Sequence, residues 1–105
     1  MMDNHQGQAG GRQDFEQHVS ALIARSGKSQ KEIARVLGYS NANIITMFKN
    51  GSTRVPPEKI VPLAQALGHS PSQLLRDWFH AYMPNVLIDI DTYLGDAQRL
   101  PNRAR

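Results

Sequence analysis

Residues 30–49 constrain the fold of this chain more than any other segment. Ala34 lies four residues before Gly38. The apolar Ile44 and Met47 follow that glycine by six and nine residues. Two helices that cross steeply need a small side chain where they approach most closely, and a tight turn needs a residue that tolerates a positive φ. The spacing therefore predicts two short helices joined at Gly38, with an apolar inner edge on the second helix.

Such a pair is the framework of a helix-turn-helix, whose second helix enters the DNA major groove. The segment resembles the Cro and lambda-repressor-like family, also called Xre-type. The resemblance is carried by Ser29, Gln30, Ala34, Gly38, Ile44, Met47, Lys49, Asn50 and Gly51. It extends more loosely over residues 14–82, because the family places one helix before the motif and two or more after it. It implies an all-α fold, a compact domain of five or six helices.

A core-facing helix is predicted over residues 14–26, with Asp14 as its N-cap, Gln17 as a capping-box partner and Gly27 as its stop. The polar residues before it have no apolar run, so residues 1–13 are expected to form a flexible tail. Residues 96–105 are expected to form a second flexible tail. The domain is therefore predicted over residues 14–95.

Capping signals mark the two helices of the motif. Ser29 with Glu32 predicts a capping box at the start of the first. The second is predicted from about Ser40 to Asn50. Its inner edge is assigned to Ile44, Met47 and Phe48. Ile45 is expected to point partly outward, where it either touches a thymine methyl group or fills a gap beside the inner edge.

Proline and glycine divide the rest of the chain. A helix is predicted from Pro57 to the stop at Gly68, bent at Pro62 because proline lacks an amide hydrogen. The next helix starts at the N-cap Ser70 and ends before Pro84. Residues 86–94 fit either a strand or a helix by their apolar pattern. A helix is favoured, because no other segment offers a strand to pair with.

Charge is distributed unevenly along the chain, whose net charge is +3. Residues 25–59 contain seven bases and two acids, a local +5, whereas residues 76–96 contain one base and four acids. A basic surface attracts the phosphate backbone of nucleic acid, although solvated helices alone can give the same pattern. No apolar run approaches the length of a membrane span, and there are no cysteines. These features favour a cytoplasmic protein that does not bind a membrane.

Residue-by-residue comparison with the resembling family assigns two sets of DNA contacts. Base readout is assigned to Ser40, Asn41, Ala42, Asn43 and Thr46. Asparagine can pair with adenine, and the alanine and threonine methyl groups can touch thymine, but asparagine and serine also commonly cap helices. Phosphate contact is assigned to Gln30, Lys31, Lys49, Arg54 and Lys59. In the family the glutamine also buttresses the recognition helix, whereas each base taken alone could be an ordinary solvated charge.

No catalytic site is expected, so the chain is not predicted to be an enzyme. Asp77 and His80 lie one helical turn apart and could form half of a metal site, but such pairs are more often surface ion pairs. The carboxylates of Asp89 and Asp91 lack a general-acid partner. No metal, cofactor or small-molecule substrate is therefore expected.

The sequence predicts a transcription regulator that binds double-stranded DNA sequence-specifically. Among regulators, a repressor is favoured. One alternative is an antitoxin that binds both a promoter and a toxin, and another is a protein-interaction module that has lost DNA binding. A homodimer is expected because one recognition helix reads few base pairs. Its interface is assigned to Ile88, Ile90 and Tyr93, although residues 86–94 could instead complete a monomeric core against Phe15 and Val19.

Overall fold

The computed structural model describes the backbone of residues 2–95 and the side chains of residues 11–95. Within these limits the chain is all-helical, without a strand. The helices are α1 (Met2–Ser26), α2 (Gln30–Val36), α3 (Asn43–Asn50), the 3₁₀ turn Pro57–Lys59, α4 (Ile60–Leu67), α5 (Pro71–Tyr82), α6 (Pro84–Asp89) and the π-helical turn Ile90–Leu94. No helix among these residues is both long and apolar enough to cross a membrane.

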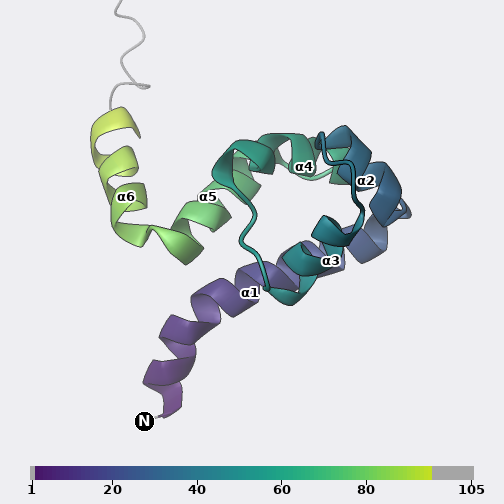
Figure 1. The fold of residues 1–105 in the computed structure, drawn as a ribbon. Coiled ribbons are helices and arrows are strands. Elements are labelled where there is room, and N and C mark those ends of the chain that lie inside the picture. Colours follow the sequence, from purple (N-terminus) through teal and green to yellow (C-terminus); the bar gives the residue numbers. More distant parts are fainter. Residues whose placement is uncertain (1, 96–105) are drawn as a thin grey trace, which may run out of the picture.

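The helices enclose one core. α1 packs on α3, α4 and α5, while α2 packs on α3 and α4. α6 packs on α5 and continues away from the bundle, as does the N-terminal half of α1 (Figure 1). The buried core consists of Phe15, Val19, Leu22, Ile23, Ile33, Ala34, Leu37, Ile45, Phe48, Val55, Ile60, Leu63, Ala64, Leu67, Leu74 and Trp78. The indole Nε1 of Trp78 donates to the Val55 carbonyl at 2.7 Å, which ties α5 to the loop after α3.

The predicted turn at Gly38 is confirmed. Gly38 has φ +88°, and its amide donates to the Arg35 carbonyl at 3.0 Å. The next amide, of Tyr39, donates to the Ala34 carbonyl at 2.8 Å. These two bonds form a Schellman motif, which satisfies the last carbonyls of α2 and turns the chain toward α3. Ala34 itself is buried, as expected for a small residue between helices.

Two of the predicted helix caps, at Ser29 and Ser70, are confirmed. The Ser29 hydroxyl accepts from the Glu32 amide at 3.1 Å, and the Glu32 carboxylate accepts from the Ser29 amide at 3.3 Å, so the predicted capping box is confirmed. The Ser70 hydroxyl accepts from the Gln73 amide at 3.2 Å at the start of α5. Residues 84–94 are helical, as favoured.

Two predicted helix starts were wrong. α1 begins at Met2 instead of Asp14, so Asp14 lies inside a helix and is not an N-cap, and residues 2–13 extend α1 instead of preceding it. α3 begins at Asn43 with Ala42 as its N-cap, three residues after the predicted start at Ser40. The tail predicted at 96–105 lies outside the described residues.

The segment that contains Pro62 is divided between two helix types. The segment starts as a 3₁₀ turn at Pro57–Lys59 and becomes an α-helix at Ile60. Pro62 therefore stands in the first turn of α4, where an amide needs no intrahelical partner. The missing amide hydrogen of proline costs no helical bond at this position.

Candidate nucleic-acid interface

Helix α3 has a buried side and an exposed side. Ile45 and Phe48 are buried in the core, with 0% and 2% of their surface exposed. Asn43 and Thr46 are exposed on the other side. The expectation that Ile45 points outward was therefore wrong: it is Ile45, with Phe48, that fixes α3 to the core, while Ile44 is only partly buried against it.

The start of α2 is tied to the exposed side of α3 by one glutamine. The Gln30 side-chain amide donates to the Thr46 hydroxyl at 2.7 Å. Its carbonyl oxygen accepts from Lys49 Nζ at 3.1 Å. The three side chains form a continuous chain of hydrogen bonds between the helices. This arrangement agrees with the buttressing role that the family resemblance implies for Gln30.

Residues 40–42, which were predicted to be helical, form a non-helical turn before α3. Asn41 is exposed, and its Oδ1 accepts from the Asn43 amide at 2.8 Å. This bond forms an Asx turn that satisfies the first amide of α3, whereas the N-cap residue itself is Ala42, which makes no side-chain capping bond. Ser40 is also exposed, and Ala42 is partly buried. Of the residues assigned to base readout, Ser40, Asn41, Ala42 and Asn43 lie at or just before the N-terminal end of α3, and Thr46 lies one turn further along it.

The residues assigned to phosphate contact do not share one environment. Lys31 is exposed on α2, and Arg54 is exposed in the loop after α3. Lys59 instead turns inward, because its Nζ donates to the Leu37 carbonyl at 2.7 Å and lies 5.1 Å from the centre of the Tyr39 ring. Lys59 therefore stabilises the C-terminal end of α2, and its ammonium group already donates one hydrogen bond to that carbonyl.

Sequence reasoning missed a basic hollow beside the C-terminal end of α3. It has a volume of about 370 Å³ and is lined by Arg12, Gln13, Glu16, Gly51, Arg54 and Tyr82. The Arg54 guanidinium lies 4.5 Å from the centre of the Tyr82 ring. Partial burial, and after it the nearby Glu16 carboxylate, raises the pKa of Tyr82 above its ordinary value. Arg12 was overlooked because it fell in the expected tail.

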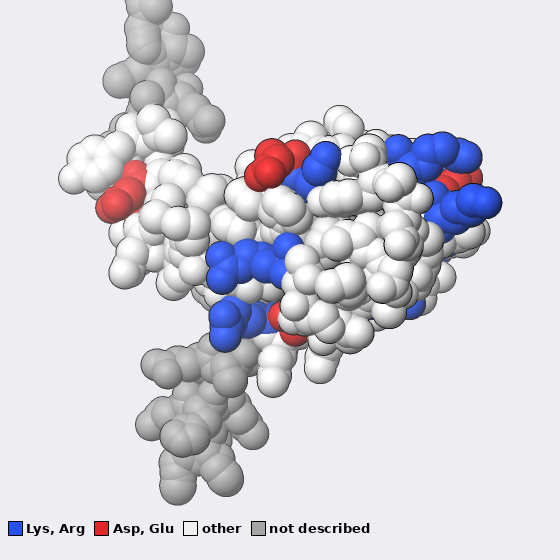
Figure 2. All heavy atoms as spheres, viewed as in Figure 1, with Lys and Arg blue, Asp and Glu red and all other residues white. Residues whose placement is uncertain are grey.

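Basic side chains border α3 on two sides. Figure 2, which has the orientation of Figure 1, shows one group of Lys and Arg over the α2 end and a second group at the opposite side of α3. The surface between them is almost free of charged groups. Bases at the borders suit the phosphate strands of a groove, while the uncharged centre suits base edges.

The C-terminal residues assigned to a dimer interface differ in exposure. Ile88 and Tyr93 expose 60% and 72% of their surface. Ile90 is partly buried in a shallow groove that also contains Leu75 and Phe79. The segment does not fold back on Phe15, whose ring instead packs edge-on against Tyr82 at 5.8 Å between centroids.

Asp91, considered for catalysis, and Asp77, considered for a metal site, each face a side chain of another helix. Asp91 accepts two hydrogen bonds from the Arg76 guanidinium, at 2.8 and 2.9 Å, and these bonds hold the pKa of Asp91 below its usual range. Asp77 faces His18 on α1, with 3.9 Å between Oδ2 and Nε2.

No family model, curated protein or solved structure matches the chain.

Proposed function

We propose that this chain binds double-stranded DNA sequence-specifically through the N-terminal end of α3 and regulates transcription, acting as a repressor by occupying an operator. The observation that carries the proposal is the hydrogen-bond chain Lys49–Gln30–Thr46. It holds the start of α2 and the exposed side of α3 in one fixed geometry. A rigid pair of helices lets backbone contacts from one helix set the register of base contacts from the other.

The surface around α3 supplies both kinds of contact that a DNA-binding helix needs. Asn41, Asn43 and Thr46 present amides and a hydroxyl that match base-edge chemistry. Lys31, exposed on α2, and Arg54, exposed in the loop after α3, supply positive charge. Neutralising phosphates would give affinity, and the amides would give sequence preference.

Selection of bound sites from random duplex DNA tests this proposal directly. We expect an enriched site containing A·T base pairs, because asparagine amides and the threonine methyl group favour adenine and thymine. Recovery of an unenriched pool would contradict sequence-specific binding. Failure to retain any duplex at low salt would contradict DNA binding altogether.

Replacing Asn43 with alanine is expected to change sequence preference without lowering stability. Its side chain is exposed at the start of α3, and a lost bidentate base contact reduces discrimination by about 1–3 kcal/mol. Asn41→Ala is expected to alter preference and also to lower stability by about 1 kcal/mol, since the bond to the Asn43 amide is removed. Competition binding with single-base variants of the selected site, together with thermal melts, separates the two effects.

Lys31→Ala is the matched control for these variants. Lys31 is exposed on α2, and a phosphate contact carries no sequence information. The lysine variant should weaken all sites alike and leave their ranking unchanged. If Asn43→Ala behaves in the same way, Asn43 does not read bases.

The proposed regulator is expected to act as a homodimer, because one recognition helix covers too few base pairs to single out an operator. The exposed apolar surface at Ile88 and Tyr93 is the candidate interface. Ile88→Asp should therefore shift the protein toward monomer and weaken operator binding. Sedimentation with and without operator DNA measures both changes.

Val61→Asp serves as a control for this experiment, since Val61 is another exposed apolar residue, on α4. A single protomer per operator at saturation would exclude the dimer. The same exposed surface also supports a second candidate, an antitoxin that holds a partner protein there. A monomer that binds operator only with a co-expressed partner would favour that candidate.

A further inference from the structure

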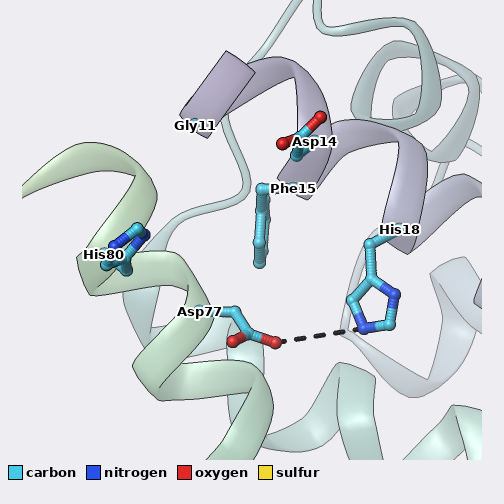
Figure 3. Close-up of a pocket in the computed structure, with 6 residues that line it drawn as sticks. All are labelled: Gly11, Asp14, Phe15, His18, Asp77 and His80. Atoms are coloured by element: carbon cyan, nitrogen blue, oxygen red, sulfur yellow. Dashed lines mark ion pairs between the residues drawn. The ribbon is translucent and has the colours of Figure 1, made fainter. Parts of the chain in front are cut away.

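The fold brings together three metal-ligating side chains that are far apart in the sequence. His18 comes from α1, His69 from the turn between α4 and α5, and Asp77 from α5. One ligand atom from each lies within 4.8 Å of the other two. Figure 3 shows His18 and Asp77 reaching toward each other from facing helices, with 3.9 Å between Nε2 and Oδ2. Sequence reasoning had considered only Asp77 with His80.

The position of His69 is set by the end of α4. Gly68 has φ +70°, and the His69 amide donates to the Ala64 carbonyl at 2.9 Å, which completes a tight helix end. Ser70 then caps α5, so the backbone of His69 is held between two fixed points. Its ring lies edge-on to that of His18, with 5.3 Å between centroids.

Within the described residues, one ring nitrogen of His69 lacks a hydrogen-bond partner. Its Nε2 is buried and accepts or donates no hydrogen bond within the described part of the chain. A buried polar atom without a partner destabilises a fold, and such an atom in a native structure calls for an explanation such as an ion. The ion pair of His18 with Asp77 leaves this nitrogen unexplained.

We propose that His18, His69 and Asp77 bind one divalent transition-metal ion, with zinc as the ion that best fits the donors. Two imidazoles and one carboxylate are typical zinc ligands, and three protein ligands leave a fourth position for water. That position opens onto a cavity of about 360 Å³, lined by Gly11, Asp14, Phe15, His18, Asp77 and His80 (Figure 3).

Zinc binding requires only a small movement of the three side chains. Ligand atoms at tetrahedral zinc lie about 3.4 Å apart, given bond lengths near 2.0–2.1 Å. The three side chains are only partly buried, so rotations about their χ angles can close the present spacing of up to 4.8 Å. Binding joins α1, the α4–α5 turn and α5, and it therefore stabilises the folded chain without involving α3.

Thermal melts of the untagged full-length chain test this site, first in chelator and then with added ZnCl₂. Free zinc at about 100 times its Kd should raise Tm by roughly 10 °C or more, because the ion binds the folded state. Cobalt chloride should give the visible absorption of a tetrahedral site, and zinc should displace it. His69→Gln should remove both signals. Its melt in chelator shows separately whether the variant folds.

His80→Gln is the matched control, because His80 is exposed, lines the same cavity and stands outside the three proposed ligands. This variant should keep the full zinc-dependent rise in Tm. A wild-type melt that zinc leaves unchanged would overturn the proposal. So would equal zinc responses in His69→Gln and the wild type, or a loss of response in His80→Gln. Asp77→Asn should behave like His69→Gln.

Discussion

Raising the salt concentration fourfold, from 50 to 200 mM, is expected to weaken duplex DNA binding about 10²–10³-fold for each bound protomer. Four to six phosphate contacts per protomer, roughly the number that the basic groups beside α3 could make, give a steep linear fall of log affinity with log salt. The two basic groups that border α3 are the proposed source of this dependence. Fluorescence anisotropy across a salt series measures the slope.

Two arginine variants make this experiment specific to the proposed surface. Arg54→Gln should reduce the slope by about 1, because Arg54 lies in the basic hollow beside α3. Arg76→Gln should leave it unchanged, because Arg76 lies on α5 and is already paired with Asp91. A flat salt dependence in the wild type would exclude phosphate contact. An equal fall of the slope in both variants would show that the phosphate contacts do not lie beside α3.

The parts of the fold that depend on neighbouring residues were predictable from the sequence. The Ser29 capping box, the Ser70 cap and the turn at Gly38 each rest on a local hydrogen-bond pattern, and all three are found. The start of α1 could not be read in the same way. Its first residues are polar and carry no periodic apolar signal, and Asp14 offered a false cap within the helix.

Features that depend on distant contacts were not predictable. Lys59 was assigned to phosphate from its place at a helix start, but the carbonyl that it binds belongs to Leu37 on another element. The cluster of His18, His69 and Asp77 exists only because α1 packs on α5, and no spacing along the chain encodes it. The exposure of Asn41 and Asn43 was predicted. The hydrogen bond between them was not, because it depends on the local geometry of the turn before α3.

Ile45 shows that motif spacing alone did not assign the buried face of α3 correctly. The spacing of Ile44 and Met47 after Gly38 placed them on the predicted inner edge, together with Phe48. The observed helix starts at Asn43 and buries Ile45 completely. Because each residue turns the helix by about 100°, Ile44 and Ile45 point in different directions, and Ile45 is the one that is fully buried. Tertiary packing, which the sequence pattern alone does not reveal, therefore decides which isoleucine anchors α3.

Ile45→Ala is accordingly expected to lower the free energy of unfolding by about 2–5 kcal/mol, a large part of the total for a domain of this size. The side chain is fully buried, so its removal leaves a cavity between α3 and the core. Tm should fall by roughly 10–30 °C. Urea denaturation and thermal melts measure the loss.

Val36→Ala is the control, since Val36 is an apolar residue on α2 with 56% of its surface exposed, and its truncation should change stability by less than about 0.5 kcal/mol. The comparison distinguishes a core anchor from a reading residue. If Ile45 touched DNA instead of the core, Ile45→Ala would leave the melt unchanged and alter the preferred site. Because Ile45 holds the helix that carries Asn43 and Thr46, we expect the opposite: a large loss of stability, with binding weakened for every sequence in proportion to the fraction unfolded.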